Sequence, residues 1–290
     1  MEINELVSRV RGVELRMRKR VERGITGGYK SAFRGGGLDF EEVRAYQYGD
    51  EVRAIDWNVT ARLGEVYVKV FREERELQVL VLNDVSGSMR FGKGGVNKFL
   101  AGVDICAMLG FGCLRNNDRF GLVGWGDGLV CNEGFGKGKG KIFKTLRGLL
   151  AVGEGRGETD LGAGLHYVEN ILKRRSLVFV ISDFLDEDYE GNLVRLGLRN
   201  EVVLVRLFHP GEVLGGFKGF LPIIDAESGV GSVLFGGLGN EVGKRFKEVG
   251  NNLKRLAGVY GFGFVELDIS QDYMAVFEGF ISSWISKRFR

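Results

Sequence analysis

The sequence predicts an α/β fold whose sheet is mostly parallel and doubly wound, with helices on both faces. Two patterns indicate this. From Glu76 onward, short apolar runs alternate with longer segments of helical periodicity, which is the order expected of βαβ units. The apolar runs, such as Val79–Leu82 and Leu177–Ile181, are continuous, as expected for parallel strands that are covered on both faces.

Taken in chain order, the predicted elements fill the chain from residue 76 to its end. The predicted strands cover residues 79–82, 119–125, 177–181, 202–207 and 263–269, and the predicted helices cover residues 99–114, 139–150, 161–172, 189–198, 242–259 and 272–285. Residues 211–239 interrupt the alternation, and their two short apolar runs predict a β-hairpin insertion. Because crossovers between parallel strands are right-handed, the topology is limited to doubly wound, Rossmann-like forms.

Residues 1–75 predict an N-terminal α+β extension in front of that core. Residues 3–22 have helical apolar spacing and a strongly basic composition, and residues 24–37 form a Gly-rich, basic loop that lacks the Gly-Lys-Ser/Thr ending of a phosphate-binding loop. Residues 67–71 alternate like a half-buried strand, which we expect to pack onto the sheet because a strand needs a partner. We therefore divide the chain into residues 1–75 and an α/β domain of residues 76–290.

Composition excludes several classes of protein. Apolar residues make up 44% of the 290 residues, enough for a large core, and the net charge of +3 is too small to indicate nucleic-acid binding. No run of about 18 apolar residues predicts a membrane span, and the acidic first residues have no apolar block behind them that would indicate a secretory signal. Three cysteines fit a reducing compartment and argue against a disulfide framework.

Oxygen-bearing side chains cluster after the predicted strands. Asp84, Ser86 and Ser88 follow the first strand at alternate positions, so their side chains can converge as the chain turns. Asp183 directly follows the strand ending at Ile181, and Thr159 precedes the helix that starts near Leu161. Ligands of an open parallel sheet bind beyond the carboxyl ends of its strands, at the topological switch point, so these three loops are expected to meet there.

The chemistry of this set favours one kind of metal. All five side chains offer hard oxygen donors, which suit Mg²⁺ or a similar divalent cation such as Mn²⁺ better than zinc. We therefore predict a metal site formed by Asp84, Ser86, Ser88, Thr159 and Asp183. Asp160, which follows Thr159, is predicted to cap the next helix and not to bind the metal.

These residues carry two resemblances. Asp-x-Ser-x-Ser, then Thr, then Asp resembles the metal-ion-dependent adhesion site (MIDAS) of von Willebrand factor type A domains in ligand type and order. Segments 49–53, 55–57, 61–62, 71–75, 84–89, 115–119 and 173–176 are similar to the bacterial family called domain of unknown function fifty-eight. Tyr48 stands where that family usually has Pro, and Glu51 where it usually has a second Asp, but neither departure touches the metal loops.

The resemblance implies a von Willebrand A-like fold and a cytoplasmic, non-enzymatic binding protein. Such proteins are often paired in bacteria with a MoxR-type AAA+ ATPase, and their proposed role is chaperone-like help in maturing or remodelling protein complexes. The chemistry of the site adds a hypothesis: neutral hydroxyl ligands leave a bound metal electrophilic, so a carboxylate of the partner could complete its coordination sphere.

Two other functions remain open. A magnesium-dependent phosphotransfer enzyme would use Asp84, but the position two residues later is Ser86 where such enzymes need a second acid, and no lysine is clearly placed to neutralise a transferred phosphate. Nucleic-acid binding through basic residues 3–22 would weaken steeply with salt, and aromatic residues do not interleave with the basic ones as single-strand stacking requires. A serine hydrolase is disfavoured because neither histidine, His166 or His209, is a convincing base for the serines.

Overall fold

The computed structural model describes residues 38–73, 76–93, 95–152, 159–212, 220–224, 231–235 and 239–288. The helix predicted for residues 3–22 and the Gly-rich loop of residues 24–37 lie outside the described residues.

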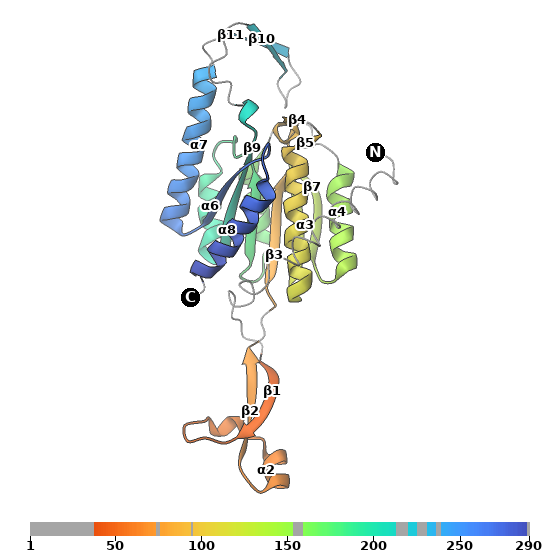
Figure 1. Cartoon of the computed structure of the whole chain (residues 1–290), viewed down its shortest axis with the longest axis vertical. Coiled ribbons are helices and arrows are strands. Elements are labelled where there is room, and N and C mark those ends of the chain that lie inside the picture. The colour runs from red at the N-terminus through yellow and green to blue at the C-terminus, as the bar shows by residue number, and fades with distance from the viewer. Residues whose placement is uncertain are drawn as a thin grey trace.

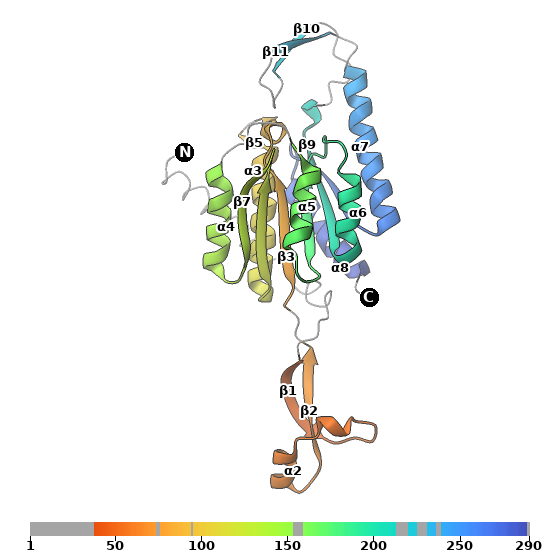
Figure 2. The same ribbon diagram turned by 180° about the vertical axis from the view of Figure 1, so that it is seen from behind.

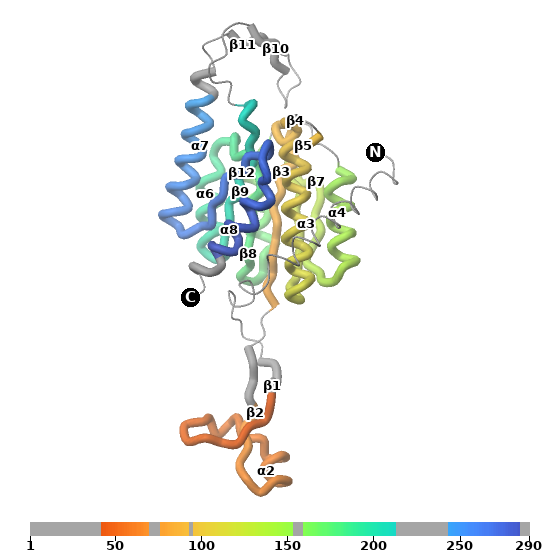
Figure 3. The backbone as a smooth tube through the Cα atoms, in the orientation of Figure 1, coloured from red at the N-terminus to blue at the C-terminus, as the bar shows by residue number. Residues whose placement is uncertain are grey.

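A six-stranded sheet forms the centre of the molecule, in the order β12-β9-β8-β3-β6-β7 (Figures 1 and 3). The strands are β3 (Gln78–Asp84), β6 (Arg119–Trp125), β7 (Leu129–Gly136), β8 (Leu177–Ser182), β9 (Glu201–Phe208) and β12 (Gly263–Asp268). All neighbours are parallel except β7, which runs antiparallel to β6. The chain winds outward in both directions from the β3/β8 pair, so the predicted doubly wound fold is confirmed and its switch point lies between these two strands.

Helices cover both faces of the sheet (Figures 1 and 2). One face carries α3 (Lys98–Asn116), α4 (Lys139–Val152) and α8 (Tyr273–Arg288), and the other carries α5 (Leu161–Ile171), α6 (Glu190–Arg199) and α7 (Gly239–Tyr260). Alternate residues of β3 serve the two cores: Val79 and Val81 pack with the first set, Leu80 and Leu82 with the second. This two-sided burial explains why the strand is a continuous apolar run.

Helix α3 is the most apolar element of the core. By length and composition alone it could cross a membrane, and no other helix in the described part of the chain meets that test. In the structure, however, 72% of its most apolar window is buried inside the fold, which is the expected state of a central core helix.

The N-terminal strand has a different partner from the one we expected. Strand β2 (Tyr67–Glu73) pairs antiparallel with β1 (Leu38–Ala45), and η1 (Val52–Ala54) and α2 (Trp57–Leu63) lie between them in the chain. Figures 1 and 2 both show this small sheet apart from the six-stranded one, so the expectation that residues 67–71 pack onto the main sheet is wrong. The pairing partner comes from within the extension itself.

Two hairpins and two 3-10 turns complete the described structure. The predicted hairpin insertion is present as β10 (Phe220–Ile224) paired antiparallel with β11 (Gly231–Phe235). A second, very short hairpin joins β4 (Gly92–Lys93) to β5 (Val96–Asn97) after the 3-10 turn η2 (Gly87–Arg90), and a further 3-10 turn, η3 (Pro210–Glu212), follows β9. The division at residue 75 into two units stays a prediction.

A glycine in α5 allows that helix to approach the end of β6. A Cβ atom at Gly164 would lie 2.8 Å from Cγ and 2.9 Å from Cδ1 of the Trp125 ring. We expect Gly164→Ala to lower the free energy of unfolding by roughly 1–3 kcal/mol, because the added methyl group overlaps the buried Trp125 ring, which would have to shift. Gly258→Ala in α7 is the matched control, since no atom lies within 4 Å of its Cβ, and it should stabilise by up to about 1 kcal/mol. Urea unfolding measures both, and a stabilising Gly164→Ala would contradict the close packing.

Candidate metal centre

Asp84 is the last residue of β3, and its buried carboxylate is held on both oxygens. Oδ1 accepts a hydrogen bond of 2.8 Å from the backbone N–H of Ser86, and Oδ2 accepts one of 2.6 Å from the hydroxyl of Ser182. Ser182 ends the neighbouring strand β8, and its Oγ in turn accepts from the backbone N–H of Phe184 at 3.0 Å. The switch point between β3 and β8 therefore fixes the orientation of Asp84, and Ser182 is a member of the site that the sequence did not single out.

The two serines of the predicted motif meet, as their alternate spacing indicates. Their hydroxyl oxygens, of Ser86 and Ser88, lie 3.1 Å apart. The Ser88 hydroxyl also hydrogen-bonds the carboxylate of Asp183, whose Oδ1 accepts from the backbone N–H of Leu185 at 3.3 Å. Four of the five predicted residues thus form one cluster at the carboxyl ends of β3 and β8.

Thr159 lies at the same end of the sheet, but on a separate loop that precedes α5. The backbone N–H of the next residue, Asp160, donates to the carbonyl oxygen of Gly126 at 3.1 Å. Gly126 follows Trp125, which is the register partner of Asp84 in β6, so the loop is anchored beside the site. The Thr159 hydroxyl makes no hydrogen bond with a residue that the structure describes, whereas Asp160 caps α5 as predicted.

Lys98, which the sequence analysis missed, is the most deeply buried charge of the site. It is the first residue of α3, its side chain is 0% exposed, and its ammonium donates to Oδ2 of Asp183 at 2.6 Å and to Glu212 in η3. The sequence analysis found no lysine clearly placed to neutralise a transferred phosphate, but the structure does bring Lys98 to the carboxylates. The ammonium is already bonded to two carboxylates, and the only sequence signal for it was a lone charge at the start of an apolar helix.

The comparisons with known proteins identify the family. Residues 42–250 match the family model described as "Protein of unknown function DUF58". The chain belongs to this family. Uncharacterized proteins of Mycobacterium tuberculosis and Mycobacterium bovis are 27% identical to this DUF58 chain over 231 residues, which cover 78% of the chain and 72% of each relative.

The comparison with solved structures matched this chain to two proteins with little sequence identity. The conserved hypothetical protein BatB from Bacteroides thetaiotaomicron is 15% identical, with a TM-score of 0.45, over 73% of this DUF58 chain and 98% of that protein. The SpRpn10 VWA domain is 15% identical, with a TM-score of 0.37, over 73% of this chain and 95% of that domain. The strand order and the position of the Asp-x-Ser-x-Ser loop in the DUF58 chain itself are those of a von Willebrand A-like fold.

The donors of the DUF58 site fit Mg²⁺ or Mn²⁺ better than zinc. Among the described residues, no three His, Cys, Asp or Glu side chains gather into a metal-binding group. A bound ion would therefore rely on hydroxyl oxygens and water beside the two aspartates, which is the hard, oxygen-only environment that magnesium favours.

The pKa values of the two aspartates are shifted in opposite directions by their surroundings. Burial, and then the nearby charge of Asp183, raise the pKa of Asp84 to about 7. Burial alone would raise the pKa of Asp183 as well, but the charge of Lys98 and the hydrogen bonds from Lys98 and Ser88 outweigh it and lower that pKa. Without metal, Asp183 is the permanently ionised partner, and Asp84 is the carboxyl whose ionisation a divalent cation would favour.

This difference predicts a pH dependence of stability in EDTA. The folded state holds the Asp84 proton more tightly than the unfolded state, whose pKa is near 3.8, so the free energy of unfolding should fall by a few kcal/mol, in order of magnitude, as pH rises from about 4 to about 7. Asp183 has the opposite effect, because its pKa is lowered in the folded state. Its contribution to the free energy of unfolding is lost as pH falls below about 4. Urea unfolding across this range should show the fall in the natural protein and lose it in Asp84→Asn. An identical slope in both would show that Asp84 does not titrate as described.

Proposed function

We propose that this DUF58 chain is a metal-dependent protein-binding module, cytoplasmic, and a partner or adaptor of a MoxR-type AAA+ ATPase in the assembly or maturation of protein complexes. The observation that carries the proposal is the convergence of Asp84, Ser86, Ser88 and Asp183 at the switch point of the sheet. The ATPase partner rests on the family resemblance.

The residues of the site have separate roles in this proposal. Ser86 and Ser88, with Thr159 from the neighbouring loop, would provide neutral oxygen ligands, and Asp84 and Asp183 would bind the ion directly or through water. Ser182 and the backbone of Ser86 hold the Asp84 carboxylate in place before any ion arrives. A bound divalent cation would supply a Lewis-acidic attachment point for a carboxylate of the partner protein.

The surroundings of the site support a protein as the ligand. Exposed large apolar side chains lie on the segments that directly follow β3, β6 and β8, at the end of the sheet that carries the site. They are Phe91, Val96, Leu129, Val130 and Leu185. Apolar side chains around a polar centre are typical of protein interfaces, and they favour a partner whose acidic residue is flanked by apolar ones.

Phosphotransfer is the weaker proposal. Lys98 could be expected to neutralise a phosphate, but its ammonium is bonded to Asp183 and Glu212, and both oxygens of Asp84 already accept hydrogen bonds. We therefore propose no enzymatic activity. The basic segment that would bind nucleic acid, residues 3–22, lies outside the described residues.

A pull-down of the MoxR-type ATPase by this chain tests the proposal. We expect capture in Mg²⁺, loss of capture in EDTA, and loss of capture by Asp84→Ala in Mg²⁺. Asp127→Ala is the matched control, because Asp127 is an exposed carboxylate on the β6–β7 loop at the same edge, and it should leave capture unchanged. Circular dichroism checks that the variants fold. Capture that ignores both EDTA and Asp84→Ala would place the interface elsewhere, and no capture under any condition would remove the ATPase as partner.

A further inference from the structure

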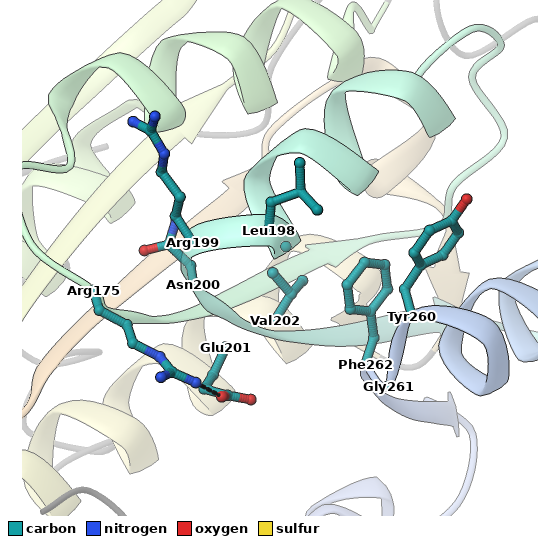
Figure 4. Close-up of a pocket in the computed structure, with 10 residues that line it drawn as sticks. Arg175, Leu198, Arg199, Asn200, Glu201, Val202, Tyr260, Gly261 and Phe262 are labelled. Atoms are coloured by element: carbon teal, nitrogen blue, oxygen red, sulfur yellow. Dashed lines mark hydrogen bonds and ion pairs between the residues drawn. The ribbon is translucent and has the colours of Figure 1, made fainter.

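A pocket of about 400 Å³ opens at the opposite edge of the sheet from the metal centre. It lies where the chain enters β8, β9 and β12, at the amino ends of these strands, whereas Asp84 and Asp183 lie at the carboxyl ends of β3 and β8. Figure 4 shows the residues that line it, with aromatic and aliphatic side chains on one side and arginines on the other.

The apolar side of the pocket is partly exposed to solvent and packed against α6. Leu198, near the end of α6, is 77% exposed, and Tyr260, the last residue of α7, is 45% exposed. The Tyr260 ring stacks on that of Phe262, with ring centres 5.7 Å apart. Phe262 in turn packs directly onto the α6 backbone, because a Cβ atom at Gly197 would lie only 2.3 Å from its ring. A large apolar side chain of a partner could bury Leu198 and Tyr260 without rearranging this floor.

The other side of the pocket is cationic. Arg175 and Arg199 line it, and Lys173 and Arg174 are exposed in the loop that leads into β8. Arg175 pairs with the buried carboxylate of Glu201, but Lys173, Arg174 and Arg199 make no ion pair with any residue that the structure describes. The pocket lining therefore holds two arginines and one carboxylate, with two further basic side chains in the adjacent loop, and Figure 4 shows the Arg199 guanidinium directed away from the aromatic pair.

We propose that this pocket is a second docking site, which takes an acidic peptide segment carrying one large apolar side chain. The apolar side chain would contact Leu198, Tyr260 and Phe262, and the neighbouring carboxylates would face Lys173, Arg174 and Arg199. Charge complementarity selects an anionic partner, and the exposed Leu198 together with the Glu201 carboxylate inside the pocket favours a peptide over a phosphate backbone. Because the pocket and the metal centre lie at opposite edges, the chain can hold two partner segments at once.

Fluorescence anisotropy with defined probes tests the proposal on the full chain. The main probe is a fluorescein-labelled pentapeptide with a central phenylalanine flanked by acidic residues. The same peptide with flanking lysines, and a labelled oligothymidylate, are the comparison probes. Leu198→Ser and Arg199→Glu change the two sides of the pocket. Val276→Ser on α8 and Arg147→Glu on α4 are matched controls, since both side chains are exposed and lie on other elements.

We expect the acidic peptide to bind, the lysine peptide not to bind, and Leu198→Ser and Arg199→Glu each to weaken binding at least about fivefold while the controls do not. Raising the salt concentration should also weaken binding, and the affinity should be the same in Mg²⁺ and in EDTA, which separates this site from the metal centre. No saturable binding of the acidic peptide up to about 1 mM, or equal losses in the controls, would overturn the proposal. Tight oligothymidylate binding that depends on Arg199 but not on Leu198 would replace it with a nucleic-acid site.

Discussion

Lys98→Met is expected to lower the free energy of unfolding by roughly 3–5 kcal/mol in EDTA, the largest stability effect among the charged residues of the site. The Lys98 ammonium is fully buried and bonded to Asp183 and Glu212. Methionine has nearly the same length, so the loss would come from leaving the buried Asp183 carboxylate without its counter-charge and not from a cavity. Urea unfolding in EDTA measures this change in the free energy of unfolding.

Two comparisons make this prediction specific. Lys244→Met removes an exposed ion pair with Glu248 on α7 and should cost less than about 1 kcal/mol. Lys98→Met combined with Asp183→Asn should recover part of the loss, because the unpaired charge is then removed as well. A cost for Lys98→Met as small as that of Lys244→Met would show that the buried pair does not form.

Asp84→Asn is expected to abolish stabilisation by Mg²⁺. In the natural protein, Mg²⁺ at about 100 times its dissociation constant should raise the free energy of unfolding by about 2.7 kcal/mol, because only the folded state gathers the ligands. Asparagine keeps the shape of the side chain and an acceptor for the Ser86 N–H, but it removes the charge that attracts the ion.

A second expectation concerns the stability of Asp84→Asn in EDTA, where no metal is bound. Since burial already raises the pKa of the Asp84 carboxyl, the neutral amide should be tolerated near neutral pH without metal. Asp127→Asn, at an exposed carboxylate, should keep the full response to Mg²⁺. Thermal unfolding with and without Mg²⁺ compares the three proteins, and an equal Mg²⁺ response in Asp84→Asn would place the ion elsewhere.

The sheet was predictable wherever a strand is buried on both faces. Val79–Leu82 and Leu177–Ile181 are continuous apolar runs, and both are central strands with nearly every residue buried. The antiparallel strand β7 was missed because it is an edge strand that is largely exposed or half-buried and contains two glycines. Strand β1 was missed because its sequence, Leu38–Ala45, is rich in charge and lacks clean alternation.

The site was predictable where its members are close in the chain and follow a strand. The alternate spacing of Ser86 and Ser88 predicted that their side chains meet. The rule that ligands bind at the carboxyl ends of parallel strands predicted that Asp183 lies near them. Lys98 could not be found this way, because a lysine in the first turn of a helix ordinarily lies in water. Its burial depends on Asp183 and Glu212, which lie 85 and 114 residues further along the chain.

The most direct test is Mn²⁺ binding followed by electron paramagnetic resonance, because Mn²⁺ takes the same hard oxygen ligands as Mg²⁺ and its free and bound forms give different signals. We expect the natural protein to bind one Mn²⁺ per chain, Mg²⁺ to displace it, and Asp84→Asn and Ser86→Ala to lose it. No bound Mn²⁺ in the natural protein, or unchanged binding in Asp84→Asn, would contradict a metal centre at the ends of β3 and β8.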